Sequence, residues 1–221
     1  LGTLAYLQTL RAPTVKVDPA IFPWVCADRI GYADPNFAAQ ESANLKAWVQ
    51  SGARRVGAYD YWYGVDYTSP RAHFAAQAAS IRTAQAVGVK GWYAELAPLW
   101  GFDAPKAWLG AKLLERPDQD AEELLTRWFA AAYGPAAEPM RAAYRIVEAA
   151  WTRDAQVGGA NQWIRHFRAE SSAAVLTEDE VTRLSAYVAQ AEAALAENDK
   201  LTFRLQNQRW RLQQFVDAWT L

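Results

Sequence analysis

The sequence is poor in the residues that thiol and metal chemistry need. It contains one cysteine, Cys26, and two histidines, His73 and His166, in 221 residues. One cysteine cannot form a disulfide within the chain, and a metal site would have to be built from carboxylates. Cys26 has no histidine nearby in the sequence to activate it, so we interpret it as a small buried residue. Neither a metal nor a cofactor is expected.

Long apolar runs and an excess of one charge sign are also missing. Lys and Arg number 23 against 24 Asp and Glu, which gives a net charge of -1 and no basic field for a phosphate backbone. No apolar run approaches the ~20 residues that a membrane-spanning helix needs. With 52% hydrophobic and 21% charged residues, the chain is predicted to be soluble and globular. Neither nucleic acid nor a membrane is expected as a partner, and the sequence indicates no oligomeric state.

Aromatic residues, in contrast, are abundant. The chain has 11 Trp, 10 Tyr and 8 Phe. Trp and Tyr combine a flat apolar face with a polar edge, which suits stacking on sugar rings or nucleobases. Since no basic patch is evident, the composition favours a carbohydrate partner.

The first hundred residues alternate extended and helical patterns. Strands are predicted over 3–8, 22–27, 55–62 and 89–96, and helices over 38–50 and from Ser69-Pro70 to Val87, with Gly52 and Gly88 as stops. Strands that alternate with helices predict an α/β fold with a parallel sheet, as in a doubly wound sheet or part of a barrel. No G-x-G-x-x-G or phosphate-loop motif follows a strand, which argues against nucleotide binding.

After Asp103 the strand signals stop and helical patterns follow. Asp120 is predicted to cap a helix, and Thr177 and Glu180 are predicted to form a capping box. We therefore expect an α/β part over 1–103 and an α-helical domain over 104–221. The predicted helices cover 105–115, 120–133, 136–151, 161–169, 178–198 and 201 towards the end.

Two predicted strand ends carry carboxylates among aromatic residues. Asp60 ends one strand and Glu95 ends the next, and neighbouring strands lie about 5 Å apart, so both side chains are expected to face one pocket. Carboxylates that flank a sugar ring carry out the chemistry of most glycosidases. Glu95 and Asp60 are thus the catalytic candidates. The candidates for sugar binding are the aromatic residues at the strand ends: Tyr6, Tyr59, Tyr61, Trp62, Tyr63, Trp92 and Trp100.

Structural roles are the alternative for the same residues. The two carboxylates can cap helices or pair with Arg54, Arg55 or Lys90, and aromatic residues dominate hydrophobic cores as well as sites. Asp28 and Arg29, at the end of the second strand, can pair with each other. For both histidines, packing or exposure is favoured over catalysis.

Three segments resemble a known family in this order: "WVQSGARRVGAYDYWYG", "SIRTAQAVGVKGWYAEL" and "WLGAKLLERPDQDAEELLTRWFAAAYGPAAEPMRAAYRIVE". Together they are similar to domain of unknown function 4838, over about the first 150 residues. The resemblance implies a glycoside-hydrolase-type (β/α)8 barrel followed by a helical region. Some members of that family are classed as retaining endo-β-N-acetylglucosaminidases.

On this resemblance the four strands are the C-terminal half of a barrel, with Asp60 and Glu95 ending its seventh and eighth strands. The chain begins Leu1-Gly2-Thr3, without an initiator Met or a secretory segment, so we expect the natural protein to start earlier. The expected function is a bacterial glycoside hydrolase of carbohydrate metabolism acting on N-acetylglucosamine-containing or related glycans, secreted or periplasmic, with this segment inactive alone. The alternatives are a non-catalytic carbohydrate-binding module and a helical interaction scaffold.

Overall fold

The computed structural model describes residues 1–63, 71–96, 100–158, 174–196 and 206–207. Four parallel strands form one sheet in the order β1-β2-β3-β4. They are β1 (Gly2–Ala5), β2 (Phe22–Cys26), β3 (Gly57–Tyr61) and β4 (Gly91–Glu95). The predicted parallel α/β arrangement is confirmed. The four strands form an open sheet, which leaves the barrel itself a prediction.

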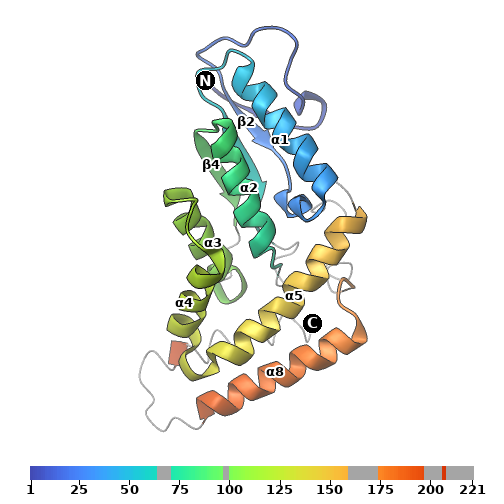
Figure 1. The fold of residues 1–221 in the computed structure, drawn as a ribbon, viewed down its shortest axis with the longest axis vertical. Coiled ribbons are helices and arrows are strands. Elements are labelled where there is room, and N and C mark those ends of the chain that lie inside the picture. The colour runs from blue at the N-terminus through green and yellow to red at the C-terminus, as the bar shows by residue number, and fades with distance from the viewer. Residues whose placement is uncertain (64–70, 97–99, 159–173, 197–205, 208–221) are drawn as a thin grey trace.

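The helices α1 (Pro35–Gln50) and α2 (Phe74–Val87) lie on one face of the sheet, in front of it in Figure 1. Buried Val25 of β2 packs in one hydrophobic cluster with Leu45 of α1 and Ala84 of α2. Because side chains alternate along a strand, the residues two positions apart from Val25 share this helix-covered face. We call the opposite side of the sheet the second face.

Local signals set the ends of these helices. Asp34 caps α1 by accepting a hydrogen bond from the backbone N–H of Asn36, and Pro35 follows as the first helical residue. Gly52, just after α1, and Gly88, at the end of α2, have φ of 107° and 99°, conformations that glycine adopts without strain. Both predicted stops are confirmed.

The start of α2 differs from the prediction. The helix begins at Phe74, whereas Ser69-Pro70 was the expected start and lies outside the described residues. Arg71 donates to the backbone carbonyls of Tyr61 and Tyr63, which ties this segment to the end of β3 before the helix begins. Tertiary contacts therefore override the local capping signal here.

The rest of the described chain is helical: α3 (Trp100–Glu115), α4 (Ala121–Tyr133), α5 (Ala137–Gly158) and α8 (Glu178–Ala196). Asp120 caps α4 as predicted. Thr177 and Glu180 form the predicted capping box, and Glu180 also accepts two hydrogen bonds from Arg153 of α5. The predicted helix over 161–169 lies outside the described residues, as does nearly all of the one from 201.

The hydrophobic core is continuous across the predicted boundary between residues 103 and 104. One cluster contains Trp62 and Phe74 from the α/β part together with Leu125, Met140 and Leu184 from the helices. The helix pair α5 and α8 packs at the lower end of the molecule, away from the strands (Figure 1). The division of the chain into two domains stays a prediction. No helix in the described part of the chain is long and apolar enough to cross a membrane.

Candidate functional site

The strand register divides the candidate residues between the two faces. Tyr61 of β3 is the partner of Glu95 of β4, and Tyr59 is the partner of Tyr93, so all four side chains share the second face. Asp60 is the partner of Ala94 and points to the helix-covered face. The sheet therefore brings Glu95 together with tyrosines rather than with Asp60.

Glu95 is the last residue of β4 and is half-buried. The Tyr59 hydroxyl donates a hydrogen bond to its Oε1. The Tyr59 ring lies 4.6 Å from the Tyr93 ring and 5.6 Å from the Tyr61 ring, measured between centroids. We refer to Glu95, Tyr59, Tyr61 and Tyr93 as the tyrosine-glutamate cluster.

The surroundings of Tyr59 and Tyr61 favour the protonated form of both phenols. Burial raises the pKa of Tyr59, and the hydrogen bond to Glu95 raises it further. Burial also raises the pKa of Tyr61, with a contribution from the nearby Tyr6 phenol. Tyr6 itself is half-buried in the turn after β1. The phenols can thus donate hydrogen bonds to a carboxylate or to sugar oxygens at neutral pH.

Cys26 ends β2 beside Tyr59 and is buried, as predicted. Burial raises the pKa of its thiol to about 11, with Arg29 lowering it and Glu95 raising it. A thiol with such a pKa is protonated at neutral pH and is a poor nucleophile.

Asp60 does not share a pocket with Glu95, which corrects the prediction from the strand ends. Asp60 is fully buried, with 0% of its surface exposed. One carboxylate oxygen accepts from the backbone N–H groups of Arg29 and Tyr61, and the other accepts from Trp62 Nε1 at 2.9 Å. The pocket was expected because both residues end strands, but Asp60 is one position out of phase with Glu95 in the ladder. In this structure Asp60 holds the turn after β2 against β3.

Two of the three tryptophans expected to stack on sugars, Trp62 and Trp92, also face the helices. Trp62 is 5% exposed and lies against Gly110 of α3, where an added Cβ would come within 2.2 Å of its ring. Trp92 is half-buried under the Arg29 guanidinium, which lies 5.1 Å from the ring centroid. Tyr63 is half-buried and Trp100 begins α3, with the Trp100 side chain outside the described residues. Trp62 and Trp92 thus pack as core residues.

The prediction missed Tyr93, Phe22 and Trp24 on the second face. Tyr93 is 51% exposed, next to Tyr59 and Glu95. The Phe22 and Trp24 rings stack at 4.7 Å, and the Trp24 indole lies over Gly57. Counting in steps of two from Glu95 would have selected Tyr93 in place of Trp92.

Buried ion pairs fix the turns at the carboxyl ends of the strands. Asp28 accepts two hydrogen bonds of 2.6 Å from Arg71, and Arg29 pairs with Glu41 at 2.7 Å, so the expected Asp28–Arg29 pair is wrong. The second oxygen of Glu41 accepts from the Tyr32 hydroxyl. Asp28 and Arg29 are consecutive residues at a turn, and their side chains point in different directions. Each therefore pairs with a charged residue from another segment of the chain.

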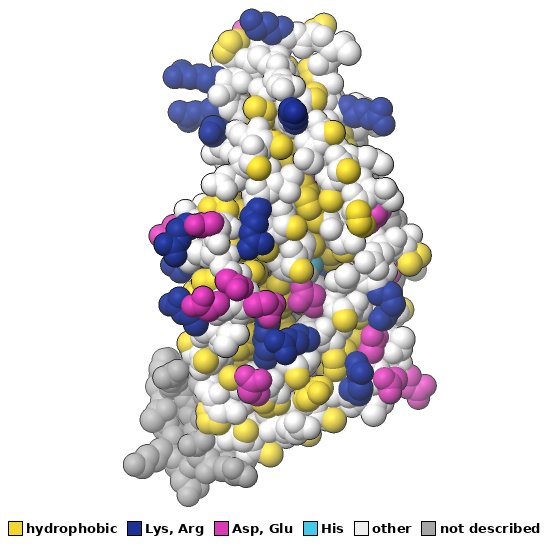
Figure 2. Space-filling model, viewed as in Figure 1, with side chains coloured by type: hydrophobic (Ala, Val, Ile, Leu, Met, Phe, Trp, Pro, Cys, Tyr) yellow, Lys and Arg dark blue, Asp and Glu magenta, His cyan; other side chains and the backbone are white. Residues whose placement is uncertain are grey.

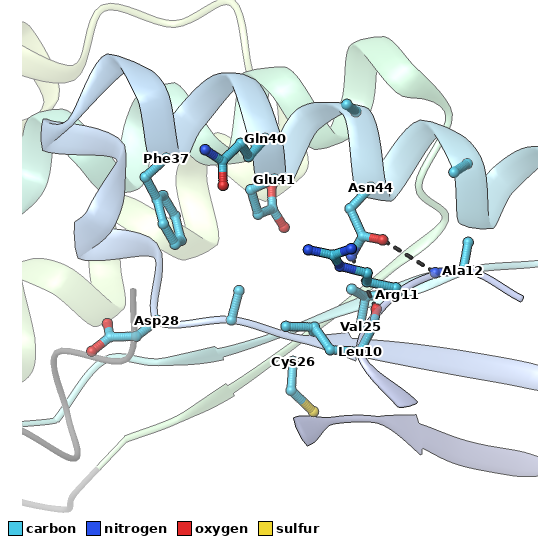
Figure 3. A pocket seen from close by; sticks show the side chains of 13 residues that line it. Leu10, Arg11, Ala12, Val25, Cys26, Asp28, Phe37, Gln40, Glu41 and Asn44 are labelled. Carbon is cyan, nitrogen blue, oxygen red and sulfur yellow. Dashed lines mark hydrogen bonds between the residues drawn. The ribbon is translucent and has the colours of Figure 1, made fainter. Parts of the chain in front are cut away.

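A pocket of about 710 Å³ lies between α1 and β2, on the helix-covered side of the sheet (Figure 3). At its edge, Asn44 joins α1 to the turn after β1. The Asn44 side chain accepts a hydrogen bond from the N–H of Ala12 and donates one to the carbonyl of Leu10. Both oxygens of Glu41 in its wall are already bound, and the Cys26 side chain points away from α1. This pocket is separate from the tyrosine-glutamate cluster. Within the described ranges, no group of three His, Cys, Asp or Glu side chains is placed to hold a metal ion.

His73 provides a pH-dependent contribution to stability. It is 1% exposed, and within the described part of the chain neither ring nitrogen has a hydrogen-bond partner. Burial, and then the charges of Arg71 and Lys106, hold its pKa well below the ordinary 6.5. The unfolded state therefore binds more protons just below pH 6.5, and the free energy of unfolding falls as the pH falls, by up to about 1.4 kcal/mol per pH unit.

Urea unfolding between about pH 5 and pH 7.5 measures this slope. We expect His73→Met to flatten it below pH 6.5. An equal slope in the wild type and the variant would show that His73 charges as readily in the folded chain as in the unfolded one.

Comparisons with known proteins give one result that identifies a relationship. No curated protein and no solved structure matches the chain. The model of one family matches residues 1–145, which include the whole sheet, α1 to α4 and the tyrosine-glutamate cluster. The chain therefore belongs to the family described as Domain of unknown function (DUF4838).

Proposed function

We propose that this protein is a glycoside hydrolase acting on N-acetylglucosamine-containing or related glycans, and that Glu95 contacts the sugar. The position of Glu95 carries the proposal. It ends a parallel strand, and its side chain lies on the second face beside three tyrosines. The Tyr59 ring lies 4.6 Å from the Tyr93 ring and 5.6 Å from the Tyr61 ring. In parallel α/β sheets, reactive residues gather at the carboxyl ends of the strands.

The fold that fits this function is a (β/α)8 barrel in which the four strands are neighbours and the second face is the interior. Three features support it: every strand pair is parallel, α1 and α2 lie on one face, and neither hydrophobic cluster of the described residues includes a second-face side chain. Phe22 and Trp24 would then fill the interior, and the tyrosine-glutamate cluster would lie at the carboxyl mouth.

The hydrogen bond from Tyr59 to Glu95 suits an ionised carboxylate, because a donor stabilises the charged form. An ionised Glu95 can attack the anomeric carbon, take a proton from water, or accept hydrogen bonds from sugar hydroxyls. The exposed ring of Tyr93 offers an apolar face to a sugar. Asp60 is on the other face, so the proton donor to the leaving oxygen has to be a residue other than Asp60.

A non-catalytic glycan-binding role is the second candidate, and one observation favours it. Among the four strands, Glu95 is the only carboxylate on the second face. A single carboxylate with tyrosines can hold sugar hydroxyls without cleaving a bond.

The isosteric change Glu95→Gln in the full-length protein tests the proposal. With an aryl N-acetylglucosaminide and a glycopeptide as substrates, we expect kcat/KM to fall on the order of 10²-fold or more, because the change removes charge and keeps shape. The exposed carboxylate of Glu115 provides the matched control Glu115→Gln, which should leave the rate unchanged. Glycan binding without turnover in the wild type would support the second candidate, and unchanged kinetics at unchanged fold would exclude Glu95 from the site.

A further inference from the structure

The amino end of the sheet carries exposed positive charge with little acid nearby. Lys16, Arg54, Arg55 and Lys90 are all exposed and precede β2, β3 and β4. We call these four residues the basic edge. Figure 2 shows dark-blue side chains around this end of the molecule, at the top, and acidic side chains mainly lower down. In the segments 12–20, 51–56 and 88–90, which form this end, Asp18 is the only carboxylate, and Glu115 of α3 lines the same hollow as Lys90.

Backbone hydrogen bonds join the segments that carry these charges. The N–H of Val17 donates to the carbonyl of Ser51 at 2.8 Å, and the N–H of Lys90 donates to the carbonyl of Val56 at 2.8 Å. The Lys16 side chain lies over Gly52, where an added Cβ would come within 2.8 Å of its Cγ. These contacts bring the segments that carry the four cations side by side at the amino end of neighbouring strands.

The four charges of the basic edge are exposed and close to one another in the fold. Within the described part of the chain, none of its four side chains makes an ion pair. Five exposed cations on or next to the helices beyond residue 100, in contrast, have carboxylate partners: Lys112, Arg116, Arg145, Arg153 and Arg183. The net charge of the chain is close to zero, but the amino end of the sheet is positively charged.

We propose that the basic edge binds a linear acidic polysaccharide, at the opposite end of the strands from Glu95. Several exposed cations on adjacent segments suit carboxylate or sulfate groups repeated along an extended polymer, and Arg54 and Arg55 can each bind such a group with two parallel hydrogen bonds. The proposal does not depend on catalysis at Glu95.

Two other polyanions fit this edge less well. Single-stranded nucleic acid needs aromatic platforms for its bases, and the nearest aromatic pair, Phe22 and Trp24, lies on the second face of the sheet rather than in the segments that carry the charges. A membrane surface needs several apolar side chains to insert, and the large apolar side chains exposed at this end are Leu1 and Val15.

Titration calorimetry of the 221-residue chain with a size-defined heparin oligosaccharide tests the proposal. Four charge contacts predict that the dissociation constant rises roughly 50-fold between 50 and 200 mM salt. The double change Arg54→Gln with Arg55→Gln should weaken binding roughly 10- to 30-fold, and Lys16→Gln with Lys90→Gln should do the same. The control, Arg116→Gln with Arg183→Gln, makes the same charge change at cations that pair with Asp118 and Asp179, and should weaken binding less than 2-fold.

Single-stranded DNA and vesicles containing anionic lipid serve as competitors. Loss confined to the basic-edge variants, with DNA and vesicles binding at least 10-fold more weakly, supports the proposal. No binding of the oligosaccharide to the wild type overturns it. So does equal weakening by the control, or tighter binding of DNA or of vesicles.

Discussion

Replacing Arg71 by methionine is expected to lower the free energy of unfolding by about 3 to 5 kcal/mol. The Arg71 and Asp28 side chains are 2% and 0% exposed, and their pairing joins the turn after β2 to the segment that precedes α2. Methionine keeps much of the apolar stem but removes the Nη2 nitrogen that donates to both oxygens of the buried Asp28 carboxylate. Urea or guanidinium unfolding at pH 7 measures the loss.

Two further variants separate charge from packing. Asp28→Leu combined with Arg71→Met removes both charges and should recover a large part of the lost stability, because the penalty comes mainly from a buried carboxylate that has lost its ion pair with Arg71. Arg145→Met removes an exposed pair with Glu122 at 3.6 Å and should cost less than about 1 kcal/mol. If Arg71→Met and Arg145→Met lowered the free energy of unfolding equally, the Arg71–Asp28 ion pair would not be a buried, stabilising contact.

Gly57→Ala is expected to cost about 3 kcal/mol, the upper end of what overpacking usually costs. An added Cβ at Gly57 would lie 2.3, 2.6 and 2.8 Å from three atoms of the Trp24 indole, which has to move off the sheet. A Cβ added at Gly91 would lie 3.0 Å from the same ring, so the indole also packs closely on the neighbouring strand and has little room to slide along the ladder.

Gly2→Ala is the matched control for Gly57→Ala. Gly2 is also a strand glycine near Trp24, and its added Cβ would meet Trp24 Nε1 at an ordinary 3.8 Å. We expect it to change the free energy of unfolding by less than about 1 kcal/mol. If thermal and chemical unfolding show both alanine variants within that limit, the Trp24 indole does not lie over Gly57.

The features that depend on neighbouring residues could be predicted from the sequence. The stops at Gly52 and Gly88, the Asp120 cap and the Thr177–Glu180 capping box each need only a few residues of context. The four strands also stand out, because short β-branched and aromatic runs between turn residues are a local signal.

The arrangement of the site depended on information that the local pattern does not contain. Tyr61, not Asp60, is aligned with Glu95 because of the register between two strands separated by a helix. Arg71 is the partner of Asp28 although 43 positions separate them. Burial of Trp62 follows from Gly110 on α3, which leaves space for its ring. Alternation alone could have assigned Tyr93 to the face of Glu95, but not the register that places Tyr59 beside it.

The parallel register also bears on the order in which the chain folds. The sheet contains no hairpin: Gly2 pairs with Phe22, and Gly57 pairs with Gly91, so each pair forms only after a long intervening segment closes. In contrast, α4 and α5 are joined by the single short turn Gly134–Ala136 and pack against each other directly. Contacts that are local in sequence form faster. The helical hairpin is therefore expected to form first and the sheet later, which leaves strand edges unpaired during much of folding.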